Sequence, residues 1–217
     1  MADPNAAAVV LGSSASRLVR PFSRRGLLSL AALALACGRG AAADRAGIVE
    51  ALAGEGGAER GGARLPLATG DAVFVGDMVV TGETARLAMR LGAATQVRLG
   101  GRTRLRIDRF LVDRGGVFTL GNGAMLYDRP DGAPGRDVEV ETPYGRLAVR
   151  GTRFFAGPSQ ERFGVFVMRG RVRVSAGDAT VDLGPGQGTD VAAIGGAPSP
   201  VRAWSEARIR AALALVE

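Results

Sequence analysis

Three acidic residues that each follow a glycine are the first candidates for chemistry in this sequence. They recur every six residues, as Gly70-Asp71, Gly76-Asp77 and Gly82-Glu83. A calcium ion takes about six to eight oxygen ligands around one point, so stacked carboxylates would supply part of a site. Aspartate is also an ordinary turn residue, because its side chain bonds nearby backbone. Calcium-binding repeats have denser glycine and a period of about nine residues, so we favour turns and predict no metal site.

Acids near predicted strand ends are the candidates for catalysis. Asp108, Asp113 and Asp128 would have to act in pairs in a glycan-cleaving enzyme, and no sequence feature pairs them. The chain has no histidine, the commonest general base and metal ligand. Its one cysteine, Cys37, excludes an internal disulfide and a cysteine-based zinc site. We predict a non-catalytic protein without a cofactor, and keep a carboxylate-based glycan-cleaving enzyme as an alternative.

Arginines provide the candidate binding surface. All 28 basic residues are arginine, and the net charge is +7. Five of them alternate with apolar residues and are predicted to share one face with few acids nearby: Arg86, Arg90, Arg98, Arg104 and Arg106. Such a face would dock an anionic partner, either an acidic protein loop or an anionic envelope polymer; a solvated surface is the alternative. Few aromatic residues are available to stack on bases, so we exclude nucleic acid.

The elements that position these residues are short strands. From residue 44 onward, apolar and polar residues alternate with a period of about two, and glycine-rich turns separate the runs. The apolar positions predicted to face inward include Leu87, Met89, Leu91, Val97, Leu99, Leu105 and Ile107. Asn122-Gly123 is a strong hairpin signal. We predict an all-β fold, a compact stack of short strands arranged as a β-roll, a solenoid or a sandwich.

One hairpin can be predicted in detail. With Pro143-Tyr144 as a two-residue turn, Glu141 lies opposite Arg146. The same register places Glu139 opposite Ala148 and Asp137 opposite Arg150, with the apolar residues Val138, Val140, Leu147 and Val149 on the other face. Gly151 then interrupts two alternating segments without a loop, which predicts a bulge or a tight bend.

The two ends of the chain differ from this pattern. Arg24-Arg25 precedes an apolar run that is shorter than the roughly 20 residues of a membrane span, and the segment resembles a twin-arginine signal peptide. We predict a signal peptide at 1–43 with cleavage after Ala43, and export to the periplasm or beyond. Lipidation at Cys37 is the alternative and the only route to membrane attachment. Residues 196–217 are predicted to form a linker and a helix, with Ser205 as N-cap; its apolar stripe is Trp204, Ile209, Ala212, Leu213 and Val216.

Several of these motifs together resemble a known family. In the first half they are Leu67, Gly70-Asp71, Gly76-Asp77, Val79-Val80, Thr81-Gly82 and the strand at 86–91. In the second half they are Thr142-Pro143, Gly145, residues 150–154 and the turn at 184–187. In this order and spacing, residues 46–192 resemble the FecR domain of bacterial periplasmic signalling proteins. We interpret as structural turn residues Gly70, Asp71, Gly76, Asp77, Thr81, Gly82, Pro143, Gly145 and Gly151.

The resemblance implies a compact all-β fold without a catalytic centre. In the best-known members, the domain relays a signal from an outer-membrane receptor to a cytoplasmic sigma factor. Those members also carry an anti-sigma domain, a membrane span and a further C-terminal module, which we do not expect in this chain. We therefore predict that residues 44–195 form an exported FecR-like domain that binds a protein or an envelope ligand. A periplasmic component of a sigma/anti-sigma relay is the alternative.

Overall fold

The computed structural model describes residues 44–111, 115–130 and 138–217. The predicted signal peptide, with Arg24, Arg25, Cys37 and Ala43, lies outside the described residues. Asp113 and Asp137 lie outside them as well. In the described part, no helix is both long enough and apolar enough to span a membrane.

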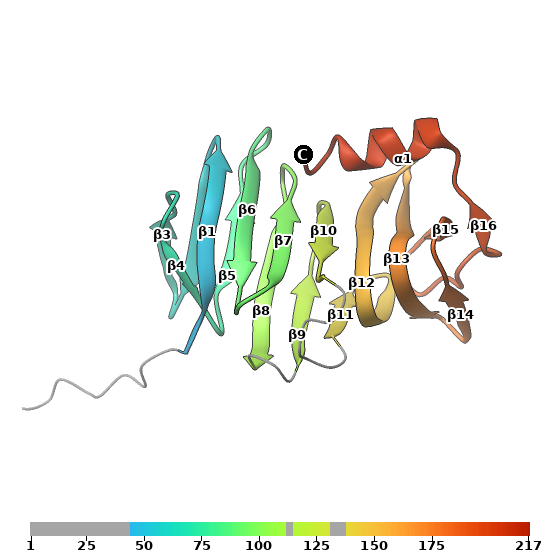
Figure 1. The fold of residues 1–217 in the computed structure, drawn as a ribbon, viewed down its shortest axis with the longest axis horizontal. Helices are drawn as coiled ribbons and strands as arrows, with labels where there is room; N and C mark the ends of the chain where they lie inside the picture. Colours follow the sequence, from blue (N-terminus) through green and yellow to red (C-terminus); the bar gives the residue numbers. More distant parts are fainter. Residues whose placement is uncertain (1–43, 112–114, 131–137) are drawn as a thin grey trace, which may run out of the picture. The chain divides into compact units, whose positions relative to one another are not determined.

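The described residues form strands and one short helix, which confirms the predicted all-β class with a C-terminal helix (Figure 1). The strands are β1 (Arg45–Ala53), β2 (Gly56–Arg60), β3 (Ala63–Pro66), β4 (Ala72–Phe74), β5 (Met78–Thr81), β6 (Arg86–Leu91), β7 (Thr95–Leu99), β8 (Arg104–Leu111), β9 (Gly115–Leu120), β10 (Met125–Asp128), β11 (Val138–Thr142), β12 (Gly145–Ser159), β13 (Arg162–Ala176), β14 (Ala179–Leu183), β15 (Gln187–Val191) and β16 (Arg202–Ala203). The helix α1 spans Glu206–Leu213.

One long hairpin, β12–β13, folds the sheet into two layers. The first half of β12 pairs with β11, whereas its second half pairs with β10. The register of β12 with β13 shifts between Arg150 and Arg153, where Gly151 has a φ of +55°. The bend predicted at Gly151 is therefore present, and it turns the hairpin from one layer into the other.

The two layers are defined by their strand order. Layer A runs β3-β2-β5-β8-β9-β11 and continues into the first half of β12, the second half of β13 and β14. Layer B runs β4-β1-β6-β7-β10 and continues into the second half of β12, the first half of β13, β15 and β16. Among the described pairings, only β9 with β11 is parallel.

The space between the layers is filled by the inward side of the alternating strands. Leu87, Met89 and Val97 of layer B share one buried cluster with Leu105 and Ile107 of layer A. All of the residues predicted to face inward are at most 1% exposed. The alternation with a period of two is therefore confirmed in β6, β7 and β8. A strand that buries one face places every second side chain in the core.

The detailed hairpin prediction is confirmed where the structure describes it. Glu141 lies opposite Arg146 and Glu139 opposite Ala148, and the four apolar residues of the pair are buried. The hydroxyl of Thr142 accepts a hydrogen bond from the Tyr144 amide at 3.1 Å, which fixes the turn. Gly145 has a φ of +146°, and a Cβ there would lie 2.3 Å from the Ser175 carbonyl oxygen. Only glycine fits this close approach.

The hairpin expected at Asn122-Gly123 is wrong. The chain does turn there, with a φ of +88° at Gly123, but β9 pairs with β8 and β11, whereas β10 pairs with β7 and β12. The segment is an arch between layers, held by the Asn122 side-chain amide donating to the Arg102 carbonyl at 2.9 Å. A turn signal specifies a reversal of the chain and leaves the pairing partners open.

The C-terminal segment packs on the outer side of layer B. The Ser205 hydroxyl accepts a hydrogen bond from the Arg208 amide at 3.4 Å, as expected of an N-cap. Figure 1 shows α1 lying across the ends of β12 and β13. Its apolar stripe joins Leu126, Phe155 and Phe166 in a second cluster that is separate from the core between the layers. A Cβ at Gly188 would lie 2.2 Å from the Trp204 indole nitrogen, so this glycine makes room for the tryptophan.

Candidate partner-binding surface

The carboxylates of Asp71, Asp77 and Glu83 each have a different partner. The Asp71 carboxylate accepts a hydrogen bond from the Ala68 amide at 2.7 Å, and Asp77 accepts one from the Phe74 amide at 2.9 Å. Glu83 pairs with Arg102. Gly70 and Gly76 have φ values of +96° and +92°. The structure thus places Asp71 and Asp77 in turns, and the residues it describes hold no cluster of three or more potential metal ligands.

Asp77 has a further role that the sequence did not reveal. Its carboxylate is fully buried and receives two hydrogen bonds from Arg60, at 2.6 and 2.7 Å. The guanidinium of Arg60 also lies 4.1 Å from the centre of the Phe74 ring. The hydrogen bond to Asp77 raises the pKa of Arg60. This ion pair ties β2 to the turn between β4 and β5.

The five predicted arginines do not share one face, so the prediction of a single arginine surface is wrong. Arg86, Arg90 and Arg98 point outward from β6 and β7 in layer B, whereas Arg104 and Arg106 point outward from β8 in layer A. Because both layers bury their other side in the same core, the two groups face opposite directions. Alternation was correct within each strand, but the turn between β7 and β8 carries the chain from one layer to the other.

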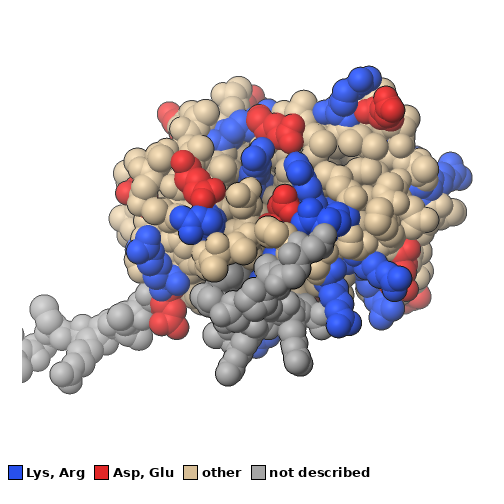
Figure 2. Space-filling model, in the orientation of Figure 1, with Lys and Arg blue, Asp and Glu red and all other residues tan. Residues whose placement is uncertain are grey.

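Most of these arginines also have partners, and two of their acidic partners lie on strands that are distant in sequence. Arg90 pairs with Glu50 at 2.6 Å, Arg104 with Glu59 at 2.8 Å and Arg106 with Asp108 at 3.0 Å. Arg86 donates to the Ala214 carbonyl at 3.0 Å. Figure 2 shows acidic and basic side chains interspersed over the face in view. The expected shortage of neutralising acids is therefore also wrong, because β1 and β2 supply Glu50 and Glu59 and β8 itself supplies Asp108.

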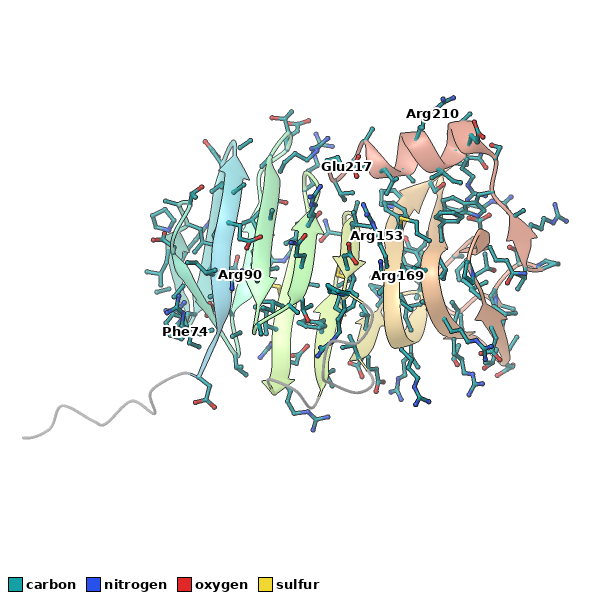
Figure 3. The ribbon with its side chains drawn as sticks, in the orientation of Figure 1. Phe74, Arg90, Arg153, Arg169, Arg210 and Glu217 are labelled. Carbon is teal, nitrogen blue, oxygen red and sulfur yellow. The ribbon has the colours of Figure 1, made fainter. Side chains whose placement is uncertain are left out.

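The two candidate catalytic acids that the structure describes, Asp108 and Asp128, do not lie side by side. Asp108 lies in layer A, where the Thr119 hydroxyl donates to it at 2.6 Å. Asp128 lies in layer B, where it accepts a hydrogen bond from Arg169 at 3.0 Å and lies 3.7 Å from Arg153. Figure 3 shows Arg153 and Arg169 close together, with Glu217 near Arg153. Arg153 and Glu217 form an ion pair at 3.7 Å. Asp128 thus serves as the centre of a charge network that joins β10, β12 and β13.

On the outer face of layer A, several arginines form ion pairs with acids on the same strand, on the neighbouring strand or on the next strand but one. The pairs are Glu59–Arg104, Asp108–Arg106, Glu139–Arg146, Glu141–Arg146 and Asp182–Arg173, at distances from 2.5 to 3.6 Å. Arg150 of β12 differs from these residues, because it lies directly opposite another arginine, Arg171 of β13. Arg150 and Arg171 form no ion pair with any other described residue of the chain.

A groove of about 440 Å³ lies at this position. Its charged lining consists of Arg150, Arg171, Arg173 and Asp182, and the small side chain of Ala148 leaves room between them. Arg173 binds Asp182 through two contacts, at 2.8 and 3.2 Å. The hydrogen bond from Arg173, with a smaller contribution from the charges of Arg173 and Arg171, lowers the pKa of Asp182. We call these four residues with Ala148 the basic groove; its charged residues carry three positive charges and one negative charge.

Comparison with known proteins identifies a family for the middle part of the chain. No curated protein matches the sequence significantly. Residues 77–173 match the family described as FecR protein. The chain contains a FecR domain. The match is narrower than the predicted 46–192, and it runs from the buried Asp77 to Arg173 in the basic groove.

Two crystal structures of a candidate anti-sigma factor from Parabacteroides distasonis ATCC 8503, at 1.65 and 2.50 Å resolution, share the fold. Their TM-scores are 0.53 and 0.52, at 19% and 20% sequence identity. The alignments cover 63% of this chain, and 64% and 63% of the two neighbours, respectively. At this identity the likeness concerns the fold, and the chain spans a little under two thirds of each neighbour.

The strands outside the matched region complete the same two layers as the FecR domain. β1 pairs with β6, and β2 pairs with β5. β14 and β15 both pair with β13. The basic groove is therefore built partly from the FecR match and partly from β14, which lies beyond it.

The sequence patterns did not predict the basic groove, because the groove depends on the register between β12 and β13. Arg150 and Arg171 become neighbours only when β12 and β13 reverse at Gln160-Glu161. Both turn residues have positive φ values, +52° and +62°, although neither is a glycine or an asparagine, so no turn signal marked the reversal. The dipeptide Arg-Gly occurs twice, at Arg150-Gly151 and Arg169-Gly170, and could have indicated this position. The backbone has a positive φ at both glycines.

Proposed function

We propose that this protein is a non-catalytic binding module of a signalling system, and that its ligand is another protein. The observation that carries the proposal is the FecR match over residues 77–173, which includes three of the four charged residues of the basic groove. The two structural neighbours are named as candidate anti-sigma factors, which supports a role for this protein in a sigma/anti-sigma relay. The two described candidate acids, Asp108 and Asp128, lie in opposite layers, which disfavours a glycan-cleaving pair.

We further propose that the protein acts outside the cytoplasm, on the strength of Arg24-Arg25 and the apolar run that follows. Cell fractionation of the full chain tests this proposal. Replacing both arginines with lysine should leave the precursor in the cytoplasm, whereas replacing Cys37 with serine should leave export unchanged and should abolish any lipid attachment. Wild-type protein found only in the cytoplasm would overturn the proposed location.

The signalling role is tested by deleting the gene and measuring all transcripts with and without restoration of the wild-type chain. We expect a defined group of genes to change together and to recover on restoration, because a relay acts on transcription as a unit. Purified full-length protein should be screened on envelope glycans in parallel. An unchanged transcript profile would contradict the proposal, and so would glycan cleavage that disappears in Asp108→Asn or Asp128→Asn.

A further inference from the structure

The basic groove places two like charges directly opposite each other on neighbouring strands. Opposite charges on neighbouring strands stabilise a sheet, whereas like charges directly opposite destabilise it. Four arginines on the outer face of layer A each have a carboxylate oxygen within 4 Å, namely Arg104, Arg106, Arg146 and Arg173, whereas Arg150 faces Arg171. Local conflicts of this kind concentrate at functional sites, where stability is given up for binding. Among the described residues, Asp182 is the one acid of the groove and it is held by Arg173, so the groove keeps an excess of positive charge that an anionic ligand would neutralise.

The backbone holds the two arginines at a defined place. Arg150 directly precedes Gly151, and Arg171 directly follows Gly170; the two glycines have φ values of +55° and +83°. A Cβ at Gly170 would lie 2.3 Å from the Gly151 carbonyl oxygen, so the strands approach closely at the bend. Both arginine side chains leave the sheet beside this bend, which fixes the spacing of their Cα atoms.

The third arginine is held in a different way. Asp182 accepts two hydrogen bonds from Arg173 and therefore fixes its guanidinium at the edge of the groove. Asp182 also provides the one negative charge of the lining, so it limits which anions fit. Arg150 and Arg171 remain as two guanidinium groups with planar pairs of donors, which match the geometry of carboxylates.

We propose that the basic groove binds an acidic segment of the partner protein, with two of its carboxylates on Arg150 and Arg171. This inference rests on the proposed function, in which the partner is a protein. Charge complementarity commits it to an acidic occupant, and the methyl group of Ala148 on the floor offers an apolar contact between the charges. Peptides carry apolar and acidic side chains together, whereas a sugar-phosphate polymer lacks the apolar ones.

Binding of the full chain to fluorescent poly-L-glutamate, measured by anisotropy at low salt, tests the proposal. The double variant Arg150→Gln, Arg171→Gln should weaken binding about tenfold or more, because it removes two charge-assisted contacts. The matched control is Arg104→Gln, Arg106→Gln, which removes the same net charge from two arginines that already have acidic partners. The control should lose less than about twofold, and all binding should weaken as salt rises.

Two outcomes of this measurement would overturn the proposal. Equal losses in both double variants would show that binding follows net charge alone. Tighter binding of inorganic polyphosphate than of poly-L-glutamate, lost in the same groove variant, would show that the groove prefers phosphate polymers. Thermal melts of each variant verify that the fold is intact, and the groove variant should melt no lower than the wild type.

A second arm separates this inference from the proposed function. The deletion strain should be restored with the groove variant instead of the wild-type chain. If deletion changes transcription and the groove variant restores it fully, the signalling role stands and the groove is not its binding site. If deletion changes nothing, the proposed function fails, whatever poly-L-glutamate binding shows.

Discussion

The FecR match begins at one ion pair and ends at another, and the two have opposite surroundings. Asp77 is fully buried against Arg60, whose side chain is 33% exposed, and it also binds the Phe74 amide. Arg173 and Asp182 are 61% and 66% exposed and contact each other above the groove. The buried pair fixes the position of a turn that many other residues depend on. The exposed pair is surrounded by water and ions that screen it, so it shapes a surface more than it stabilises a fold.

Breaking the buried pair should have the largest effect. Asp77→Asn removes the charge that holds Arg60 and leaves a buried group with poorer hydrogen bonds. We expect a loss of about 3 kcal/mol in the free energy of unfolding, at the low end for a disrupted buried pair because Arg60 reaches solvent. Urea denaturation of the full chain measures it. Asp71→Asn, at an exposed turn acid with one backbone contact, is the control, and an equal loss in both would show that burial of Asp77 is irrelevant.

The bend beside the groove gives the next largest effect. Gly151 has a φ of +55°, and a Cβ there would meet no atom within 4 Å, so any penalty comes from the backbone. Gly151→Val should cost about 1–2 kcal/mol of unfolding free energy, because a branched side chain disfavours this conformation. Gly151→Asn, which tolerates positive φ, should lose clearly less. Equal denaturation midpoints for valine and wild type would mean that the strain is absent.

Relieving the like-charge contact should have a smaller effect with the opposite sign. Arg171→Gln removes the repulsion from Arg150 without changing the size of the side chain greatly. We expect a gain of about 0.5 kcal/mol in stability at low salt, which shrinks at high salt. Thermal melts at two salt concentrations check this expectation. A loss of stability at low salt would show that the attraction between Arg171 and Asp182 outweighs the repulsion from Arg150, and would weaken the case for the basic groove.

The exposed pair should show the smallest effect, and only at neutral pH. The pKa of Asp182 is lowered in the folded state, chiefly by its hydrogen bond from Arg173. Its contribution is therefore present above the unfolded pKa of about 3.9 and is lost as pH falls through the folded pKa. The melting temperatures of wild type and Asp182→Asn should differ slightly at pH 7 and converge in strong acid. A difference that persists in acid would have to come from packing.

What the sequence predicted correctly was local. The inward residues of β6, β7 and β8 follow from alternation, and the register at Glu141–Arg146 follows from one short turn. These features need only a few neighbouring residues, because side-chain direction and a two-residue turn are set by the backbone nearby.

What the sequence could not predict was the assignment of strands to layers. Arg98 and Arg104 are close in sequence and alternate in the same way, yet they face opposite directions, because the intervening turn crosses between layers. The partner of Asp77 lies 17 residues earlier, on β2, and no local pattern links the two. Arg150 and Arg171 meet only through the reversal at Gln160-Glu161. Each of these contacts depends on packing between distant strands, which single-sequence patterns do not encode.

The hairpin β12–β13 also sets the order in which the protein can assemble. Strands β10 and β11 each take a place beside β12, so neither has its full set of neighbours until residues 145–159 are available. The strands that are synthesised earlier therefore keep unpaired edges until then. Unpaired edges slow folding and can pair with other chains. Because β12 joins β11 of layer A and β10 of layer B, the two halves of the sheet can be joined only after this hairpin is present.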